Sequence, residues 1–170
     1  MTMLEKENLE INTKPKRQKR TLGAVMEISI DGEYYVYVQS YPYNKEIIFD
    51  YRSAEPLKDL SVLLTAKQLF RVTVYRHVIG SGHWLKVGKL PLREDLLPVQ
   101  MQYVHHNYGN LEFEIYNPMT GRTIPSSKDE CKGLEEAAVW DYGAIKDRIR
   151  DHYNGIPCRW LKNEYEIFND

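Results

Sequence analysis

The sequence has little of what marks a disulfide-stabilised, metal-bound or membrane-spanning protein. Its 170 residues include two cysteines, Cys131 and Cys158, and no CxxC pair. A disulfide framework or a four-ligand metal site needs more than this, so we expect both as reduced thiols of a cytoplasmic protein. No apolar run approaches the ~20 residues that span a bilayer. The N-terminal stretch also lacks the apolar core of a secretory signal, and we expect no membrane partner.

Catalytic and cofactor motifs are missing as well. There is no GxSxG and no HExxH, and Gly80-Ser81-Gly82 lacks the lysine and the helix of a P-loop. His105 and His106 are adjacent, so on a strand they point to opposite faces and do not easily share a metal. We therefore expect no catalytic residue, no cofactor and no metal ligand, in a protein that is not an enzyme. A small hydrolase that uses His105 or His106 stays open as an alternative.

Strand-forming residues, by contrast, are plentiful. Hydrophobic residues make up 42% of the chain, charged residues 28%, and thirteen residues are tyrosine. This composition is typical of a soluble globular domain, and the length suffices for one hydrophobic core but is short for two. Tyrosine combines an apolar ring with a polar tip, so it suits both sheet faces and contact surfaces.

The clearest structural pattern lies in residues 22–53. Asp31-Gly32 between alternating apolar runs predicts a type I′ hairpin turn, because both central residues of that turn need a positive φ. Both faces of the hairpin are partly apolar, so we expect both to be covered, or the sheet to curl into a barrel. The register that follows from this turn pairs Ile30 with Glu33, Ile28 with Tyr35 and Met26 with Tyr37.

The rest of the chain reads mainly as strands with one good helix. Tyr142–Tyr153 has apolar residues three and four apart, with Asp141 as N-cap and Gly155 behind its last turn. Residues 135–140 fit either a helix or a strand. The fold class is therefore α+β and strand-dominated, with a curved antiparallel or barrel-like sheet, one well-defined C-terminal helix and short helical segments. Strands are expected at 46–52, 69–78, 84–87, 100–106, 110–116 and 164–168, a short helical piece at 57–64 and a loop at 124–128.

Charge is distributed unevenly along the chain. Residues 1–20 hold six Lys or Arg and three Glu, which leaves 17 basic and 21 acidic residues, a net charge of −4, in the remainder. We expect residues 1–20 to form a disordered basic tail and residues 21–170 a single domain. The acidic body suits a basic partner and makes nucleic acid an unlikely one. A small nucleic-acid-binding barrel that uses the basic run 14–20 and sheet tyrosines remains the first alternative.

Four segments in the same order resemble the bacterial immunity protein 26 family of polymorphic-toxin and contact-dependent inhibition systems. Together they cover about residues 20–155, with two departures. The opening reads Gly-Ala-Val-Met without a following proline, where the family more often has Gly-Asp-Val-Phe, and Asp141 stands where glycine is common. The segments are LGAVMEI at 22–28, FDYRSAEPL at 49–57, LFRV at 69–72 with SGHW at 81–84 and GKLPL at 88–92, and LEEAAVWD at 134–141 with DRIRDH at 147–152.

This resemblance implies a non-enzymatic protein that binds and neutralises a cognate toxin domain in the cytoplasm. Tight protection needs about 1,200–2,000 Å² of interface with aromatic anchors and complementary charge. A toxin that acts on nucleic acid is basic around its site, which suits the acidic body. The oligomeric state stays open. The partner-binding residues that we predict on these grounds are exposed acids near the last helix and surface tyrosines, namely Glu135, Glu136, Asp147, Asp151, Tyr108 and Tyr142.

Overall fold

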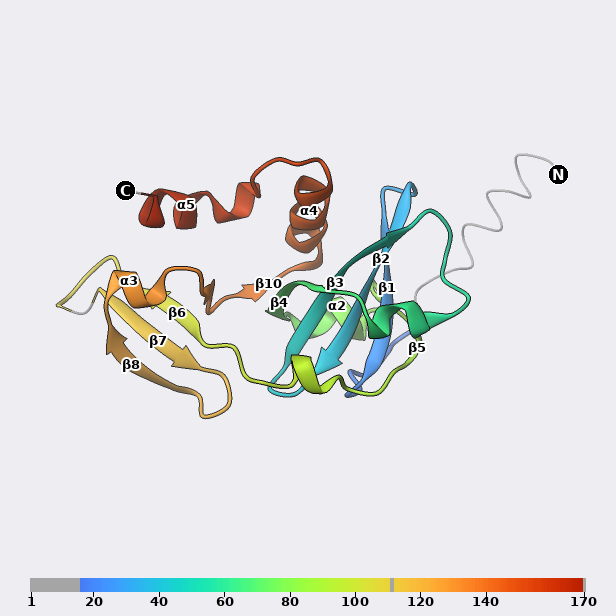
Figure 1. The fold of residues 1–170 in the computed structure, drawn as a ribbon, viewed down its shortest axis with the longest axis horizontal. Coiled ribbons are helices and arrows are strands. Elements are labelled where there is room, and N and C mark those ends of the chain that lie inside the picture. The colour runs from blue at the N-terminus through green and yellow to red at the C-terminus, as the bar shows by residue number, and fades with distance from the viewer. Residues whose placement is uncertain (1–15, 111, 170) are drawn as a thin grey trace.

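Two β-sheets, one of six strands and one of four, form the framework of the protein (Figure 1). The structure is a computed structural model that describes residues 16–110 and 112–169. The larger sheet contains β1 (Ala24–Ile30), β2 (Tyr34–Tyr41), β3 (Lys45–Ser53), β4 (Gln68–Val74), β5 (Leu85–Lys89) and β10 (Val139–Trp140). The smaller sheet contains β6 (Gln102–His105), β7 (Phe113–Asn117), β8 (Arg122–Ser126) and β9 (Glu135–Glu136).

Helical segments cover both sheets. They are η1 (Leu60–Leu64), α2 (Arg76–Gly80), η2 (Glu94–Leu96), α3 (Lys128–Cys131), α4 (Tyr142–Tyr153), η3 (Arg159–Leu161) and α5 (Lys162–Phe168). The strand orders are β10-β4-β3-β2-β1-β5 and β8-β7-β6-β9, antiparallel except for β10 beside β4 and β9 beside β6. The predicted α+β, strand-dominated class is therefore confirmed, with the strands divided between two mixed sheets.

The hairpin turn is confirmed, but the predicted register is wrong by one residue. Asp31 and Gly32 have φ values of 55° and 70°, and the Glu33 N–H donates to the Ile30 carbonyl at 2.9 Å, as in a type I′ turn. Glu33 is an extra loop residue, so Ile30 pairs with Tyr34 rather than with Glu33. Because side chains alternate along a strand, this slip exchanges the faces of β2. The observed pairs also set Ile28 opposite Val36 and Met26 opposite Val38.

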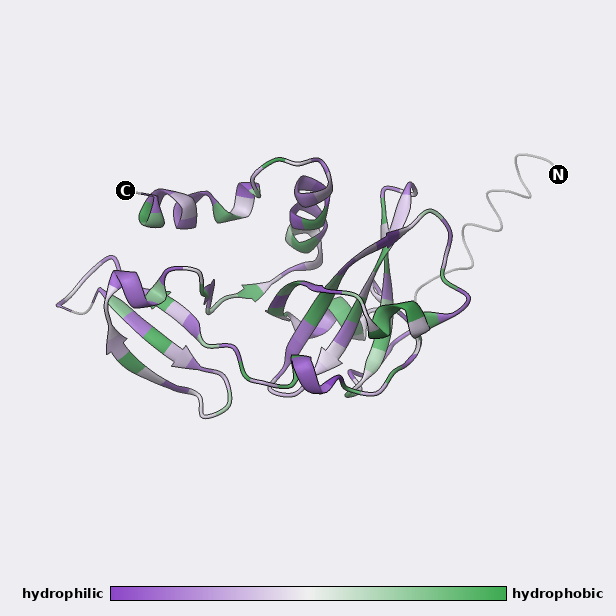
Figure 2. Ribbon diagram, in the orientation of Figure 1, coloured by the Kyte–Doolittle hydropathy of each residue, from purple (hydrophilic) through white to green (hydrophobic). Residues whose placement is uncertain are grey.

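Both faces of the larger sheet are buried, as the apolar character of both hairpin faces predicts. On one face Met26, Ile28 and Val38 pack with residues of α2 and α4 in a cluster that includes Trp84 and Trp140. On the other face Val25 and Tyr37 pack with residues of η1 and η2. Figure 2 shows hydrophobic residues along the central strands and a largely hydrophilic α4. The two helix pairs therefore enclose the sheet without closing it into a ring.

The helix predicted at Tyr142–Tyr153 is α4, and it matches the prediction in bounds and caps. The Asp141 carboxylate accepts from the Tyr142 N–H, and Gly155 has a φ of 69° just beyond the helix. Ile145 and Ile149 are fully buried against the larger sheet. Asp151, predicted to face water, is instead buried. The chain beyond Gly155 folds back, and Arg159 then covers that carboxylate.

The smaller sheet confirms one expectation, and two others are wrong in β8 and α5. Its central pair, β6 with β7, lies where two adjoining strands were predicted. Residues 124–128 were expected as a loop, but β8 continues to Ser126 and pairs with β7. Residues 164–168 were expected as an edge strand, but they are the end of α5, which packs the partly buried Ile167 and Phe168 against Tyr103 and Phe113. That packing selects the helix, because a short apolar segment has no decisive period of its own.

Residues 135–140, left open between helix and strand, form β9 and β10. Each is two residues long and adds a parallel edge strand, β9 to the smaller sheet and β10 to the larger one. This segment therefore passes from one sheet to the other and leads directly into α4.

Two residues at the end of the predicted basic tail contact the folded domain. Residues 1–15 of the predicted tail lie outside the described residues. Gln18, however, donates its side-chain amide to the carbonyls of Ile79 and Trp84, and its amide oxygen accepts from the Lys86 N–H. Arg20 donates to Glu46 at 2.5 Å. Gln18 and Arg20 are thus held against the folded domain by partners more than twenty residues away.

Candidate functional site

An open groove of about 760 Å³ runs along α4 and β10. Tyr75, Val139 and Trp160 line it and are 51%, 48% and 58% exposed. Such large apolar side chains usually lie inside a domain, whereas here three of them come together at the surface. Clustered aromatic exposure of this kind marks interaction surfaces.

The groove is shaped by the caps and buried face of α4. Asp141 starts the helix at Tyr142, and burial of Ile145 and Ile149 turns Lys146 and Asp147 toward the groove. The Tyr142 ring is half-buried and stacks on the His83 ring, with centroids 4.1 Å apart. The wall of the groove is therefore a helix face fixed by the hydrophobic core.

Hydrogen bonds hold the exposed tryptophan in place. The Trp160 indole N–H donates to Asp147 Oδ2 at 2.9 Å, and Arg150 Nη1 donates to Asp147 Oδ1 at 2.7 Å. Arg150 is in turn bound to Asp31 through two further hydrogen bonds. A ring that is already fixed loses less entropy when a partner covers it.

Three of the six predicted partner-binding residues, Glu136, Tyr142 and Asp147, line this groove. Tyr108 is 83% exposed but lies in the loop between β6 and β7, outside the groove. Glu135 is adjacent to Glu136 in the sequence, but its carboxylate is bound by both terminal nitrogens of Arg148. The structure therefore brings together half of the predicted residues and separates the rest.

Asp151 requires a correction, because it was predicted as an exposed acid. The residue is 1% exposed, and its carboxylate accepts hydrogen bonds from the backbone N–H and the guanidinium of Arg159. These bonds hold the pKa of the Asp151 carboxyl below its ordinary value. A buried carboxylate with a fixed arginine partner stabilises the turn after α4, so Asp151 is not the exposed acid that was predicted.

The remaining acids near α4 are also largely neutralised within the chain. Asp147 is paired with Arg150 and Glu135 with Arg148, whereas Glu136 has no ion pair within residues 16–110 and 112–169. The net charge of −4 therefore overstates the acidity of this surface. The Asp147–Arg150 pair follows from its i,i+3 spacing on a helix, whereas the Glu135–Arg148 pair has no local sequence signal.

A second, acidic cleft of about 480 Å³ separates α5 from β6 and β9. Glu136, Glu164 and Glu166 line it with Tyr103 and His105. Burial and the nearby charges of Glu135 and Glu136 raise the pKa of Glu164 to about 7. This cleft was not predicted from the sequence, because it depends on residues 164–168 being a helix rather than the expected strand.

The histidines proposed for a hydrolase have structural partners. The His105 ring packs on Phe113 with centroids 4.7 Å apart, and His106 Nε2 lies 2.7 Å from Glu114 Oε2. Elsewhere His77 Nε2 lies 2.8 Å from Asp141 Oδ1. In the described part of the chain, no three His, Cys, Asp or Glu side chains gather as metal ligands. Cys131 and Cys158 are free, buried thiols.

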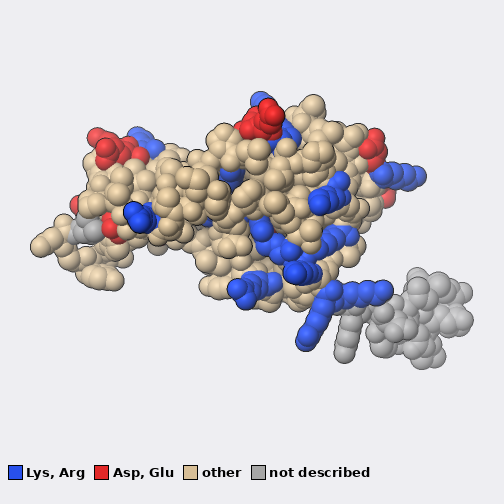
Figure 3. Space-filling view, turned by 90° about the horizontal axis from the view of Figure 1, so that it is seen from below, with Lys and Arg blue, Asp and Glu red and all other residues tan. Residues whose placement is uncertain are grey.

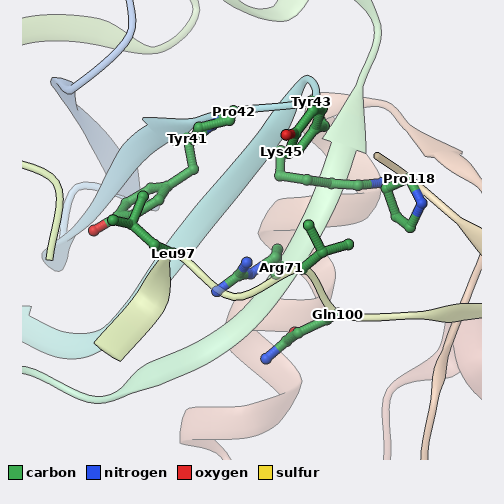
Figure 4. Close-up of a pocket in the computed structure, with 9 residues that line it drawn as sticks. Tyr41, Pro42, Tyr43, Lys45, Arg71, Leu97, Gln100 and Pro118 are labelled. Carbon is green, nitrogen blue, oxygen red and sulfur yellow. The ribbon is translucent and has the colours of Figure 1, made fainter. Parts of the chain in front are cut away.

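Two buried cations lie at the junction of the sheets (Figure 4). Lys45 Nζ donates to Gln102 Oε1 at 2.8 Å and Thr73 Oγ1 at 2.9 Å, and burial lowers the pKa of Lys45. Arg71 donates to Gln68 and to the carbonyls of Leu96 and Pro98. In Figure 4 the two charged ends point apart rather than to one centre. These side chains therefore join structural elements and do not form a shared anion site.

Tyr75 and Trp160 were not singled out from the sequence. Tyr75 was placed inside a strand 69–78, but β4 ends at Val74 and Tyr75 precedes α2 as its N-cap residue. Trp160 follows Gly155-Ile156-Pro157, which interrupt the helix. A large aromatic residue in a surface loop is the one local signal that could have marked Trp160 as a contact residue.

Comparison with known proteins adds no further information. Neither a family model, nor a curated protein, nor a solved structure matches the chain. None of the helices within the described residues is long and apolar enough to cross a membrane.

Proposed function

We propose that this chain is an immunity protein that binds a cognate bacterial toxin domain in the cytoplasm and occludes its active or substrate-binding site. The resemblance of four ordered segments to the immunity protein 26 family supports the class. The observation that carries the proposal is the open groove along α4, in which Tyr75, Val139 and Trp160 are exposed together.

The chemistry of this groove suits a protein partner. Buried aromatic anchors supply most of the binding energy in protein interfaces, and the surrounding contacts mainly exclude water. Trp160 already has its N–H bonded to Asp147, so a partner covers the ring without leaving a buried donor unpaired. Inhibition by occlusion needs no catalytic residue, cofactor or metal from this chain.

The test is binding to the variable C-terminal domain of a large secreted protein encoded directly upstream. Trp160→Ala is expected to weaken binding at least tenfold, because loss of a central aromatic anchor costs about 2 kcal/mol or more. Met119→Ala serves as a matched control, since Met119 is exposed on the turn between β7 and β8, away from the groove. Calorimetry measures both affinities, and circular dichroism confirms folding.

The same variants are then tested in cells that express the toxin domain. Wild type and Met119→Ala are expected to restore growth, and Trp160→Ala to restore it less. If the purified wild-type chain does not bind the toxin domain, the proposed function is wrong.

A further inference from the structure

Besides the groove along α4 and the acidic cleft, the surface has a hollow of about 670 Å³ that adjoins the groove. Tyr75 and Val139 line both, so the two form one continuous surface on either side of these residues. We call it the β10 hollow, since β10 lies between it and the groove along α4. Its floor is aliphatic, with Val74, Ile79 and Val139.

The rim of the β10 hollow is basic. Lys19 and Arg76 line it, are exposed, and have no ion pair within the described residues. Arg20 also lines it but is bound to Glu46, which is 1% exposed and additionally accepts from Ser40. The carboxylate in the hollow is thus already neutralised, and the free charges there are positive.

The adjoining groove has charge of both signs. Asp147 is paired with Arg150 and Lys146 has no ion pair in the part of the chain described, whereas Asp141 contacts the His77 ring and no Lys or Arg there. Figure 3 shows Lys and Arg side chains gathered on one face of the molecule, with Asp and Glu side chains mainly at its margins. Glu136 also lines the groove without an ion pair within the described residues, so the positive excess is a property of the β10 hollow.

We infer that the toxin domain docks on the β10 hollow with an acidic segment that carries an apolar side chain. The carboxylates pair with Lys19 and Arg76, and the apolar side chain fills the floor beside Val139. This inference rests on the proposed function and names the partner chemistry at one end of the same surface. The net charge of this chain suggested a partner with a basic contact surface, whereas the β10 hollow favours an acidic one.

The hollow favours a protein segment over a nucleic-acid strand. Single-stranded nucleic acid binds where several aromatic rings stack its bases along a basic channel. Here Tyr75 is the one aromatic residue among those lining the hollow, and the rest of its floor is aliphatic. β10 also lies at the edge of the larger sheet, where an extended segment can run alongside.

The test measures affinity for the same upstream-encoded toxin domain at low and high salt. The double variant Lys19→Glu/Arg76→Glu is expected to bind at least tenfold more weakly at low salt and to lose most of the salt dependence of wild type. Lys58→Glu/Lys132→Glu is the matched control, because both lysines are exposed and outside the surface. Its affinity is expected to stay within about twofold of wild type.

The outcomes separate the two proposals. Absence of wild-type binding refutes the proposed function. Wild-type binding that the Lys19→Glu/Arg76→Glu variant leaves unchanged or strengthens refutes the acidic segment alone. A labelled single-stranded oligonucleotide provides the last comparison. If it binds wild type but not the double variant, while toxin binding is unaffected, the hollow is a nucleic-acid site and the inference is wrong.

Discussion

The carboxylate of Asp31 accepts two hydrogen bonds from the guanidinium of Arg150, at 2.7 and 2.8 Å, across 119 residues of chain. Asp31 is also a central residue of the first hairpin turn, with a φ of 55°. Arg150 continues the connection to Asp147, which holds the Trp160 ring. Asp31 therefore has two roles. It forms part of the hairpin turn, and through Arg150 and Asp147 it helps to hold Trp160 in the proposed binding groove.

Replacing Asp31 with Asn isolates the charge of this pair. Asparagine tolerates positive φ, so the turn itself is retained. Arg150 holds the pKa of Asp31 below its ordinary value of 3.8, so the stabilisation is present above that value and is lost as pH falls through the folded-state pKa. We expect a lower melting temperature for Asp31→Asn at pH 7 and a difference that shrinks below about pH 4.

Thermal unfolding followed by circular dichroism at several pH values checks this. Glu55→Gln, at an exposed acid without an ion pair in the described chain, is the control and should match wild type throughout. A deficit of Asp31→Asn that stays constant down to pH 2 would show that the turn, not the ion pair, is responsible.

Deleting Glu33 tests the observed hairpin register. The deletion leaves the two-residue turn Asp31-Gly32 and still sets Ile30 opposite Tyr34, so every side chain of β2 keeps its face. We expect a folded protein with a melting temperature within a few degrees of wild type. Amide chemical shifts of β2 provide the measurement, and widespread shifts with loss of cooperative unfolding would contradict the register.

Lys45 and Gln102 should show an asymmetric double-mutant cycle. Gln102→Leu leaves a buried ammonium short of an acceptor and is expected to cost about 2–3 kcal/mol, since hydrogen bonds to charged groups are the strong ones. Lys45→Met removes the buried charge together with its hydrogen bonds, so we expect a cost of only about 1 kcal/mol.

In the Lys45→Met background, Gln102→Leu should then cost much less than it does alone, because the two residues are coupled. Urea unfolding of the four proteins measures the free energies. Purely additive effects would mean that Lys45 does not join the two sheets through Gln102.

Glu164 should make the docking of α5 dependent on pH. Its pKa is raised to about 7, so its stabilising contribution is present below the ordinary value of 4.5 and is lost as pH rises through about 7. The groups that face it are Glu135 and Glu136 of β9, Tyr103 of β6 and Arg148 of α4. We expect faster amide hydrogen exchange in α5 at pH 8 than at pH 6, after correction for intrinsic rates.

Glu164→Gln should abolish this difference and protect α5 at pH 8, because the amide carries no charge. Glu166→Gln, at an exposed position on the same helix, should leave the difference in place. Equal protection of wild-type α5 at both pH values would rule out the titration of Glu164 as its cause.

Features set by local chemistry were predictable from the sequence. The Asp31-Gly32 turn needs residues that accept positive φ, and α4 has a capping aspartate, a buried stripe and a terminal glycine. Both are short-range consequences of residue type, and both were found. The α+β class followed from the same patterns.

What the sequence could not supply depends on partners far apart in the chain. The face that β2 presents depended on one extra residue, Glu33, and α5 became a helix because Phe168 packs on Tyr103. Of the acids predicted near α4, Glu135 and Asp151 are paired with arginines that folding brings close. Asp147 is paired with Arg150 of the same helix, and Glu136 has no ion pair within the described residues. Local sequence thus determined turns, caps and fold class, whereas tertiary packing alone decided which charges remain free and which aromatic rings, Tyr75 and Trp160, stay at the surface.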